Sequence, residues 1–143
     1  MAVLKVSSLN CQGQSKLTLA KQLFIQNILQ VKKYDILCLQ ETFMEDDVFK
    51  NCDFLMSNYN NFGTAVLVKN SFKIDDFKID TDGRIIILNV GGLTIVNVYT
   101  KTGTDGDSRR SRDNMFSETL PNGWGSNTCR LNLLGWWIRR GTF

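Results

Sequence analysis

The sequence contains no histidine and a single proline among its 143 residues. Without an imidazole, the chain cannot build a Ser-His-Asp triad, a Cys-His pair or a histidine general base. None of its four cysteines forms a Cys-x-x-Cys pair, so the sequence does not offer a zinc site either. These absences direct the search for chemistry toward carboxylates, amides and phenols.

Neither sign of charge dominates, because 17 Lys and Arg stand against 14 Asp and Glu and give a net charge of +3. This weakly basic balance permits nucleic-acid binding without arguing for it. No apolar run approaches the roughly 20 residues that span a bilayer, and Lys5 interrupts the apolar start of the chain. Cys11 and Cys38, on expected buried strands, fit a reducing compartment. We therefore expect no membrane partner and an intracellular location, nuclear or cytoplasmic.

The length fits one domain, and its first 40 residues predict a βαβ unit. Residues 3–9 are β-prone, and residues 36–40 form a short apolar strand. Between them an amphipathic helix is expected, with Ser15 as its N-cap and Lys33 near its end. The face that we expect to be buried carries Ala20, Phe24, Ile28 and Val31.

The middle of the chain predicts antiparallel strands. Residues 42–62 are polar and acidic, and we interpret them as a loop with one short helix. Gly91-Gly92 between two apolar runs predicts a two-residue hairpin turn. Strands are expected at residues 64–68, 72–79, 84–90 and 93–99.

Polar side chains follow three of the expected strands: Asn10, Glu41 and Tyr99. Ligands collect at the carboxyl ends of strands in α/β sheets. A carboxylate there can bind Mg²⁺ together with water and substrate phosphate, while an amide or a phenol can contact a phosphate oxygen. The alternatives are a solvated loop acid, a turn asparagine before Gly13 and a tyrosine that packs at a strand end.

The segments Asn10–Gly13, Leu39–Thr42 and Asn97–Tyr99 resemble motifs of the endonuclease/exonuclease/phosphatase superfamily. The resemblance is closest to the apurinic-type endonuclease domain of LINE-type (non-LTR) retrotransposons, although Thr100 stands where that family has a proline. It implies an α/β fold, the N-terminal half of a four-layer α/β/β/α sandwich of the DNase-like kind. It also implies Mg²⁺-dependent hydrolysis of DNA phosphodiester bonds for target nicking. Glu41 would then bind the metal, with Asn10 and Tyr99 as catalytic residues.

The resemblance stops before the family's later Gly-Asp-x-Asn and Asp-His elements, which this sequence lacks. We therefore expect a partial domain over residues 1–121, an atypical tail over 122–143, and little or no nuclease activity from the chain alone. The codons of Trp136-Trp137 encode Gly-Gly when they are read one base later. In the resembled family, Gly-Gly often precedes Asp-Phe-Asn. We hypothesise that the tail is frameshifted; the alternative is a short strand within residues 131–138.

Basic residues beyond Tyr99 are the candidate nucleic-acid contacts, because cations neutralise phosphates. They are Arg109, Arg110 and Arg112. A solvated helix start is the other interpretation, and Arg84 is expected to have a structural role across neighbouring strands. Two other functions stay open. One is a non-catalytic remnant that binds nucleic acid or another chain, including itself through an exposed sheet and the tail. The other is a phosphoesterase of the same fold.

Overall fold

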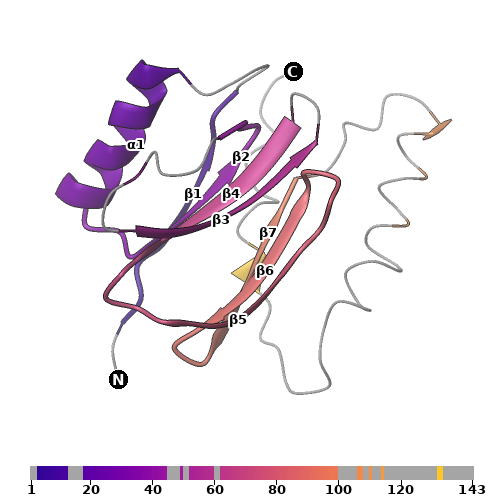
Figure 1. Cartoon of the computed structure of the whole chain (residues 1–143). Coiled ribbons are helices and arrows are strands. Elements are labelled where there is room, and N and C mark those ends of the chain that lie inside the picture. Colours follow the sequence, from indigo (N-terminus) through magenta and orange to yellow (C-terminus); the bar gives the residue numbers. More distant parts are fainter. Residues whose placement is uncertain are drawn as a thin grey trace.

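The computed structural model describes residues 3–12, 18–44, 49, 52–59, 62–99, 106–107, 110, 114 and 132–133. Within them, two four-stranded sheets lie face to face, and helix α1 covers the outer face of the first (Figure 1). None of the described helices is long and apolar enough to cross a membrane.

The first sheet has the strand order β1-β2-β4-β3. Its strands are β1 (Val6–Asn10), β2 (Ile36–Gln40), β3 (Cys52–Tyr59) and β4 (Phe62–Lys69). β1 and β2 are parallel, and α1 (Leu19–Val31) connects them, so the predicted βαβ unit is confirmed. β2 is buried along its whole length, which explains its nearly continuous apolar sequence.

Helix α1 differs from its prediction in its start and in its buried face. Thr18 is the N-cap and its hydroxyl accepts a hydrogen bond from the Lys21 N–H, so the expectation for Ser15, which lies outside the described residues, is wrong. Ile25 and Leu29 are the buried residues, whereas Phe24 and Val31 are exposed. Apolar residues occur on more than one side of this helix, so periodicity alone could not select the side that meets the sheet.

The expectation of a loop throughout residues 42–62 is also wrong, because β3 occupies Cys52–Tyr59. It pairs antiparallel with β4 along its full length and forms one edge of the sheet. The apolar centre of this strand, Phe54–Met56, is short and lies in a polar, acidic stretch. Sheet pairing therefore overrides the local composition here.

The second sheet has the order β5-β6-β7-β8. Its strands are β5 (Ile74–Ile79), β6 (Ile85–Val90), β7 (Leu93–Val98) and β8 (Asn132–Leu133). The predicted hairpin is confirmed: Gly91 and Gly92 join β6 to β7 with φ of 57° and 77°, as a type I′ turn requires. β8 runs parallel to β7, in agreement with the alternative of a short strand in the tail.

Alternation along the strands divides the apolar residues between two layers of core. Leu37 and Leu39 of β2 pack toward Ile25 and Leu29 of α1. The intervening residues of β2 face the second sheet. That inter-sheet core contains Ile36, Cys38, Val66, Val68, Ile86, Leu88, Val90 and Ile95. The described layers are therefore α/β/β, the arrangement expected for the N-terminal half of a DNase-like sandwich.

Candidate active site

The candidate site begins where the inter-sheet core ends. Because Ile36 and Cys38 face the second sheet, alternation turns Gln40 the same way. By the same rule, Asn97 follows Ile95 on the inner side of β7, and Ser8 follows Val6 on β1. Three polar side chains therefore terminate an apolar layer.

These side chains form one hydrogen-bonded network. The Asn97 Nδ2 donates to the backbone oxygens of Leu39 and Ala65, at 2.9 Å each, and so ties β7 to the first sheet. The Asn97 Oδ1 accepts from the Gln40 Nε2 at 2.7 Å, and that nitrogen also donates to the Ser8 hydroxyl at 2.9 Å. Asn97 is completely buried, so each of these bonds replaces water that cannot reach it. The network fixes the relative positions of three strand ends.

The structure brings the three candidate residues to this end of the molecule. Asn10 is the parallel partner of Gln40 in the sheet register, and Glu41 is the next residue after Gln40. Tyr99 lies two residues after Asn97, on the same side of its strand by alternation. The hydrogen bond between Gln40 and Asn97 thus joins the segments that carry Glu41 and Tyr99, and the pairing of β1 with β2 adds the segment that carries Asn10.

Asn10 forms a local turn of the kind named as its alternative. Its Oδ1 accepts a hydrogen bond from the backbone N–H of Gln12 at 2.8 Å, and Gln12 has a φ of 50°. This arrangement is an Asx-turn, which ends β1 at a fixed place. The amide nitrogen of the side chain is not used by that bond.

Glu41 lies at a sharp change of backbone direction. Its φ is 51°, in the left-handed region that costs a non-glycine residue about 1 kcal/mol. This conformation interrupts the strand alternation after Gln40 and leaves the side chain half-buried. Glu41 is the one carboxylate among the three candidate residues. Backbone strain of this kind is often found at functional positions.

The pKa of the buried Cys11 thiol reflects the charges in the region around Glu41. Burial raises the pKa of Cys11 to about 11, the positive charge of Lys21 opposes the shift, and the negative charge of Glu41 adds to it. The Lys21 ammonium donates to the backbone oxygen of Cys11 at 2.6 Å. Helix α1 therefore supplies a cation to the region around the carboxylate, which the sequence alone did not indicate.

A close backbone approach supports the segment after Glu41. The Thr42 N–H donates to the Gly63 oxygen at 3.0 Å. A Cβ added to Gly63 would lie 1.8 Å from the Thr42 oxygen and 2.4 Å from the Asn58 Oδ1. Only glycine fits this contact, so Gly63 is part of the structure that holds Glu41 in place.

Tyr99 is held from the neighbouring strand by Arg84. The Tyr99 N–H donates to the Arg84 oxygen at 2.8 Å, and the guanidinium carbon lies 5.8 Å from the centre of the tyrosine ring. Asp80 accepts from the Arg84 N–H at 3.1 Å. The Nη1 of Arg84 is buried and has no hydrogen-bond partner in the described part of the chain. Arg84 therefore places a buried donor, without a partner among the described residues, beside the phenol.

The arginines after Tyr99 are placed only in part. Arg110 is exposed and forms an ion pair with Asp107 at 3.3 Å. Arg109 and Arg112 lie outside the described residues. A nucleic-acid role for these three arginines therefore stays a prediction.

Among the described residues, no group of three or more histidine, cysteine, aspartate or glutamate side chains could hold a metal ion. The oxygen donors at these strand ends are instead one carboxylate, that of Glu41, and the amide of Asn10 and phenol of Tyr99 on the adjoining strand ends. All of these are hard oxygen ligands, and Mg²⁺ commonly uses one or two protein carboxylates with water and phosphate for the rest. The residues fit a magnesium ion of that weakly held kind.

Sequence reasoning missed the residues that support the site. They are Ser8, Lys21, Gly63 and the buried pair Gln40 and Asn97. A signal was present, because Asn97 interrupts the apolar run Leu93–Val98 at an inward position. A buried polar residue within a strand needs partners, and those partners lie on the other sheet.

This chain belongs to the endonuclease/exonuclease/phosphatase family, which its sequence matches over residues 7–139. The enzymes of this family generally use divalent metal ions. The match continues to residue 139, past residue 121, where the sequence analysis places the end of the family domain. The boundary at residue 121 stays a prediction. Among curated proteins, none matches this sequence.

Solved structures agree with the family in fold. The 3′ phosphatase NExo from Neisseria, bound to a product DNA hairpin, has 21% identity and a TM-score of 0.67, covering 83% of this chain and 51% of its own. An AP endonuclease from Archaeoglobus fulgidus has 20% identity and a TM-score of 0.65, covering 85% of this chain and 51% of its own. TDP2 from Caenorhabditis elegans has 22% identity and a TM-score of 0.60, covering 83% and 41%. The chain thus spans about half the length of these structures.

Proposed function

We propose that this chain carries the N-terminal, carboxylate-bearing part of a Mg²⁺-dependent endonuclease that hydrolyses DNA phosphodiester bonds. In this proposal Glu41 binds the metal, and Asn10 and Tyr99 contact the phosphate. The ion would polarise the phosphoryl oxygen and orient a water. The motifs around Glu41 and Tyr99 favour an endonuclease of a LINE-type retrotransposon, nicking its target in the nucleus.

One observation carries the proposal: the hydrogen bond that joins Gln40 to Asn97. It crosses between the sheets and sets Glu41 and Tyr99 on neighbouring strand ends, while sheet pairing sets Asn10 beside Gln40. The arrangement collects a carboxylate, an amide and a phenol at one end of the core. Gln40 and Asn97 are 57 residues apart in sequence, so this bond forms only because the fold brings the ends of β2 and β7 together.

Cations around this end favour a phosphate-containing substrate. Lys21 binds the backbone oxygen of Cys11, whose thiol also senses the charge of Glu41, and Arg84 carries beside Tyr99 a buried guanidinium nitrogen with no partner among the described residues. Oxygen atoms of a phosphodiester are suitable acceptors for such donors. The NExo structure contains a product DNA hairpin, and DNA is the substrate proposed for this chain, with Arg109, Arg110 and Arg112 contacting its backbone.

The proposal includes weak or absent cleavage by this chain alone. Phosphodiester hydrolysis needs a positioned water and charge stabilisation together, and one carboxylate supplies only part of either. The rival proposal is a non-catalytic remnant that binds nucleic acid. It is favoured by the lack of a multi-carboxylate cluster in the described part of the chain.

The test is DNA binding measured by fluorescence anisotropy with a labelled duplex, in Mg²⁺ and in EDTA. We expect tighter binding in Mg²⁺ for the wild type and no Mg²⁺ effect for Glu41→Gln. Asp53→Asn is the matched control, since Asp53 is an exposed carboxylate at the other end of the sheet. Equal Mg²⁺ dependence in both variants would contradict the metal role of Glu41.

Cleavage is tested separately by nicking of supercoiled plasmid. We expect no difference between the wild type and Glu41→Gln. Binding that depends on salt but never on Mg²⁺ or Glu41 would establish the remnant in place of the nuclease.

A further inference from the structure

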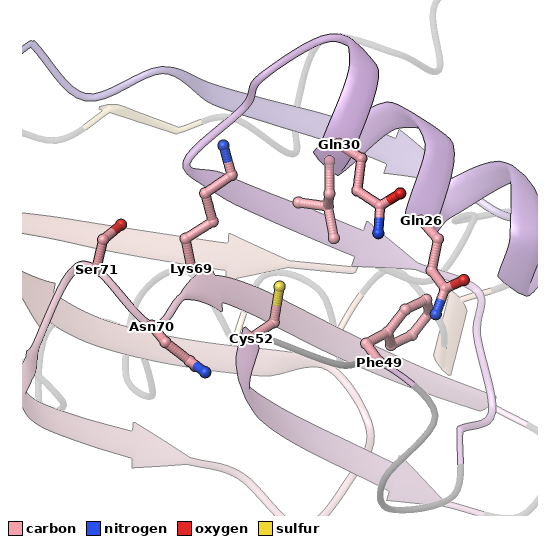
Figure 2. Close-up of a pocket in the computed structure, with 8 residues that line it drawn as sticks. Gln26, Gln30, Phe49, Cys52, Lys69, Asn70 and Ser71 are labelled. Atoms are coloured by element: carbon pink, nitrogen blue, oxygen red, sulfur yellow. The ribbon is translucent and has the colours of Figure 1, made fainter.

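A pocket lies at the opposite end of the first sheet from the candidate site. Its volume is about 400 Å³, within the range of small-molecule sites. It is lined by α1, by Phe49, by the start of β3, and by the end of β4 with the turn that follows (Figure 2). Lys69 marks this end of β4, whereas Thr64, which pairs with Gln40, marks the other. Five residues of strand separate them by about 17 Å, so this pocket is distinct from the candidate site.

The pocket has an apolar floor and a polar rim. Leu29 and Phe49 are buried, and they form the floor together with Cys52. Figure 2 shows the side chains of Gln26 and Gln30 directed from α1 toward Cys52 and Phe49, while the Lys69 ammonium rises from β4 toward the helix. Such a combination of apolar surface and a few convergent polar groups is the usual composition of a ligand site.

Among the residues that the structure describes, Lys69 is the one charged side chain in the lining of the pocket. Its ammonium lies 3.8 Å from the Asp35 Oδ1, a long ion pair that uses at most one of its three N–H donors. The other oxygen of Asp35 already accepts from the Lys5 N–H at 2.8 Å. A ligand could therefore bind Lys69 without leaving the Asp35 carboxylate unpaired.

We propose that this pocket binds a small organic anion, with its carboxylate on Lys69 and its apolar body on Leu29 and Phe49. The amides of Gln26 and Gln30 complete the rim as hydrogen-bonding groups. The proposal is independent of the nuclease function, because neither the ligand nor its contacts involve the strand ends at Gln40.

Cys52 provides the readout, because it lines the pocket and is a free, partly accessible thiol. Burial raises its pKa, Lys69 opposes that shift, and Asp53 reinforces it. Alkylation by iodoacetamide at about pH 8.5, where the thiolate fraction supports the reaction, is followed at the Cys52 peptide by mass spectrometry. The other cysteines then do not contribute to the signal.

The probe is 4-phenylbutyrate, and its neutral amide is the control ligand. We expect 4-phenylbutyrate to slow the alkylation of Cys52 saturably and the amide to bind at least about tenfold more weakly, as loss of a charge-assisted hydrogen bond predicts. Lys69→Gln should weaken protection by 4-phenylbutyrate to the same degree. Lys73→Gln, an exposed lysine outside the pocket, should leave protection unchanged.

Each variant is compared with itself in the presence and absence of the probe, because removing Lys69 also changes the reactivity of the thiol. Absence of protection in the wild type would overturn the proposal. Equal protection by the acid and the amide, or by wild type and Lys69→Gln, would overturn the assignment of an anion. The comparison of acid with amide uses only wild-type protein, so it holds even where a variant folds poorly.

Discussion

The two ends of β2 are held by different kinds of interaction. At Gln40 the connection to the second sheet is a buried network of neutral amides, with Asn97 completely inaccessible to solvent. At Asp35, just before β2, the carboxylate accepts a hydrogen bond from the Lys5 N–H and forms a long ion pair with Lys69, in which both side chains remain partly exposed. Buried amides are costly to disturb, whereas partly solvated ion pairs contribute little. The end with the buried network is the one that carries the candidate site.

The largest effect is expected at the close contact beside Glu41. Gly63→Ala would place a methyl group 1.8 Å from the Thr42 backbone oxygen, which has no flexible side chain to move. We expect a loss of more than about 4 kcal/mol in the free energy of unfolding, or failure to fold. Gly106→Ala is the control, because its Cβ would meet nothing within 4 Å. Urea denaturation followed by circular dichroism measures both, and a Gly63→Ala variant as stable as the control would contradict the contact.

The amide network should give the next largest effect. Asn97→Ala removes bonds to two backbone oxygens and to Gln40, leaving buried polar groups unsatisfied. We expect a loss of about 3 kcal/mol in the free energy of unfolding. Asn89→Ala in the same sheet should cost only about 1 kcal/mol, because half-buried Asn89 accepts a single bond from Thr94. Urea denaturation measures both variants. Similar losses would show that the buried Asn97 contributes no more to stability than the half-buried Asn89.

Cys11 should make stability depend on alkaline pH. Burial raises the pKa of its thiol from 9.0 to about 11. Because the pKa is higher in the folded state, the thiol of the unfolded chain ionises first as pH rises. The free energy of unfolding is therefore unaffected by this thiol below pH 9 and falls as pH rises from 9 toward 11. The loss is about 2–3 kcal/mol over that range.

Cys11→Ala keeps both backbone hydrogen bonds of residue 11 and removes the thiol. The difference in unfolding free energy between wild type and Cys11→Ala should therefore shrink with pH only above about 9. A constant difference from pH 7 to 11 would show that the thiol is not buried in this way.

The smallest effect is expected at the ionic end of β2. Asp35→Asn removes the charge opposite Lys69 while an oxygen remains to accept from the Lys5 N–H. We expect a change in unfolding free energy within about 1 kcal/mol, which weakens further as salt is added. Thermal unfolding at low and high salt measures it. A loss as large as that of Asn97→Ala would make the two ends of the strand equivalent.

Much of the fold could be predicted from local patterns. The apolar strand at Ile36–Gln40 and the Gly91-Gly92 turn are specified by neighbouring residues, and both are confirmed. Strand β3 and the buried face of α1 were missed, because sheet pairing and sheet contact decide them. These are long-range effects that one sequence does not display.

The candidate site, like the fold, could be predicted from the sequence only in part. Asn10, Glu41 and Tyr99 are visible as polar residues at strand ends, and their assigned roles stay predictions. The connection between Gln40 and Asn97 could not be predicted, because it depends on how two sheets face each other. Arg84 presents a donor beside Tyr99 for the same reason. Backbone pattern thus indicates which residues to examine, and packing between sheets decides which of them meet.

The most direct test of the shared site is a titration of the ¹⁵N-labelled protein with Mn²⁺, a paramagnetic substitute for Mg²⁺, observed by two-dimensional NMR. We predict that the backbone signals of Asn10, Glu41 and Tyr99 broaden together at low Mn²⁺ in the wild type and in Asp53→Asn, and that Glu41→Gln abolishes this broadening. Broadening centred elsewhere, or unaltered by Glu41→Gln, would contradict a metal site at these strand ends.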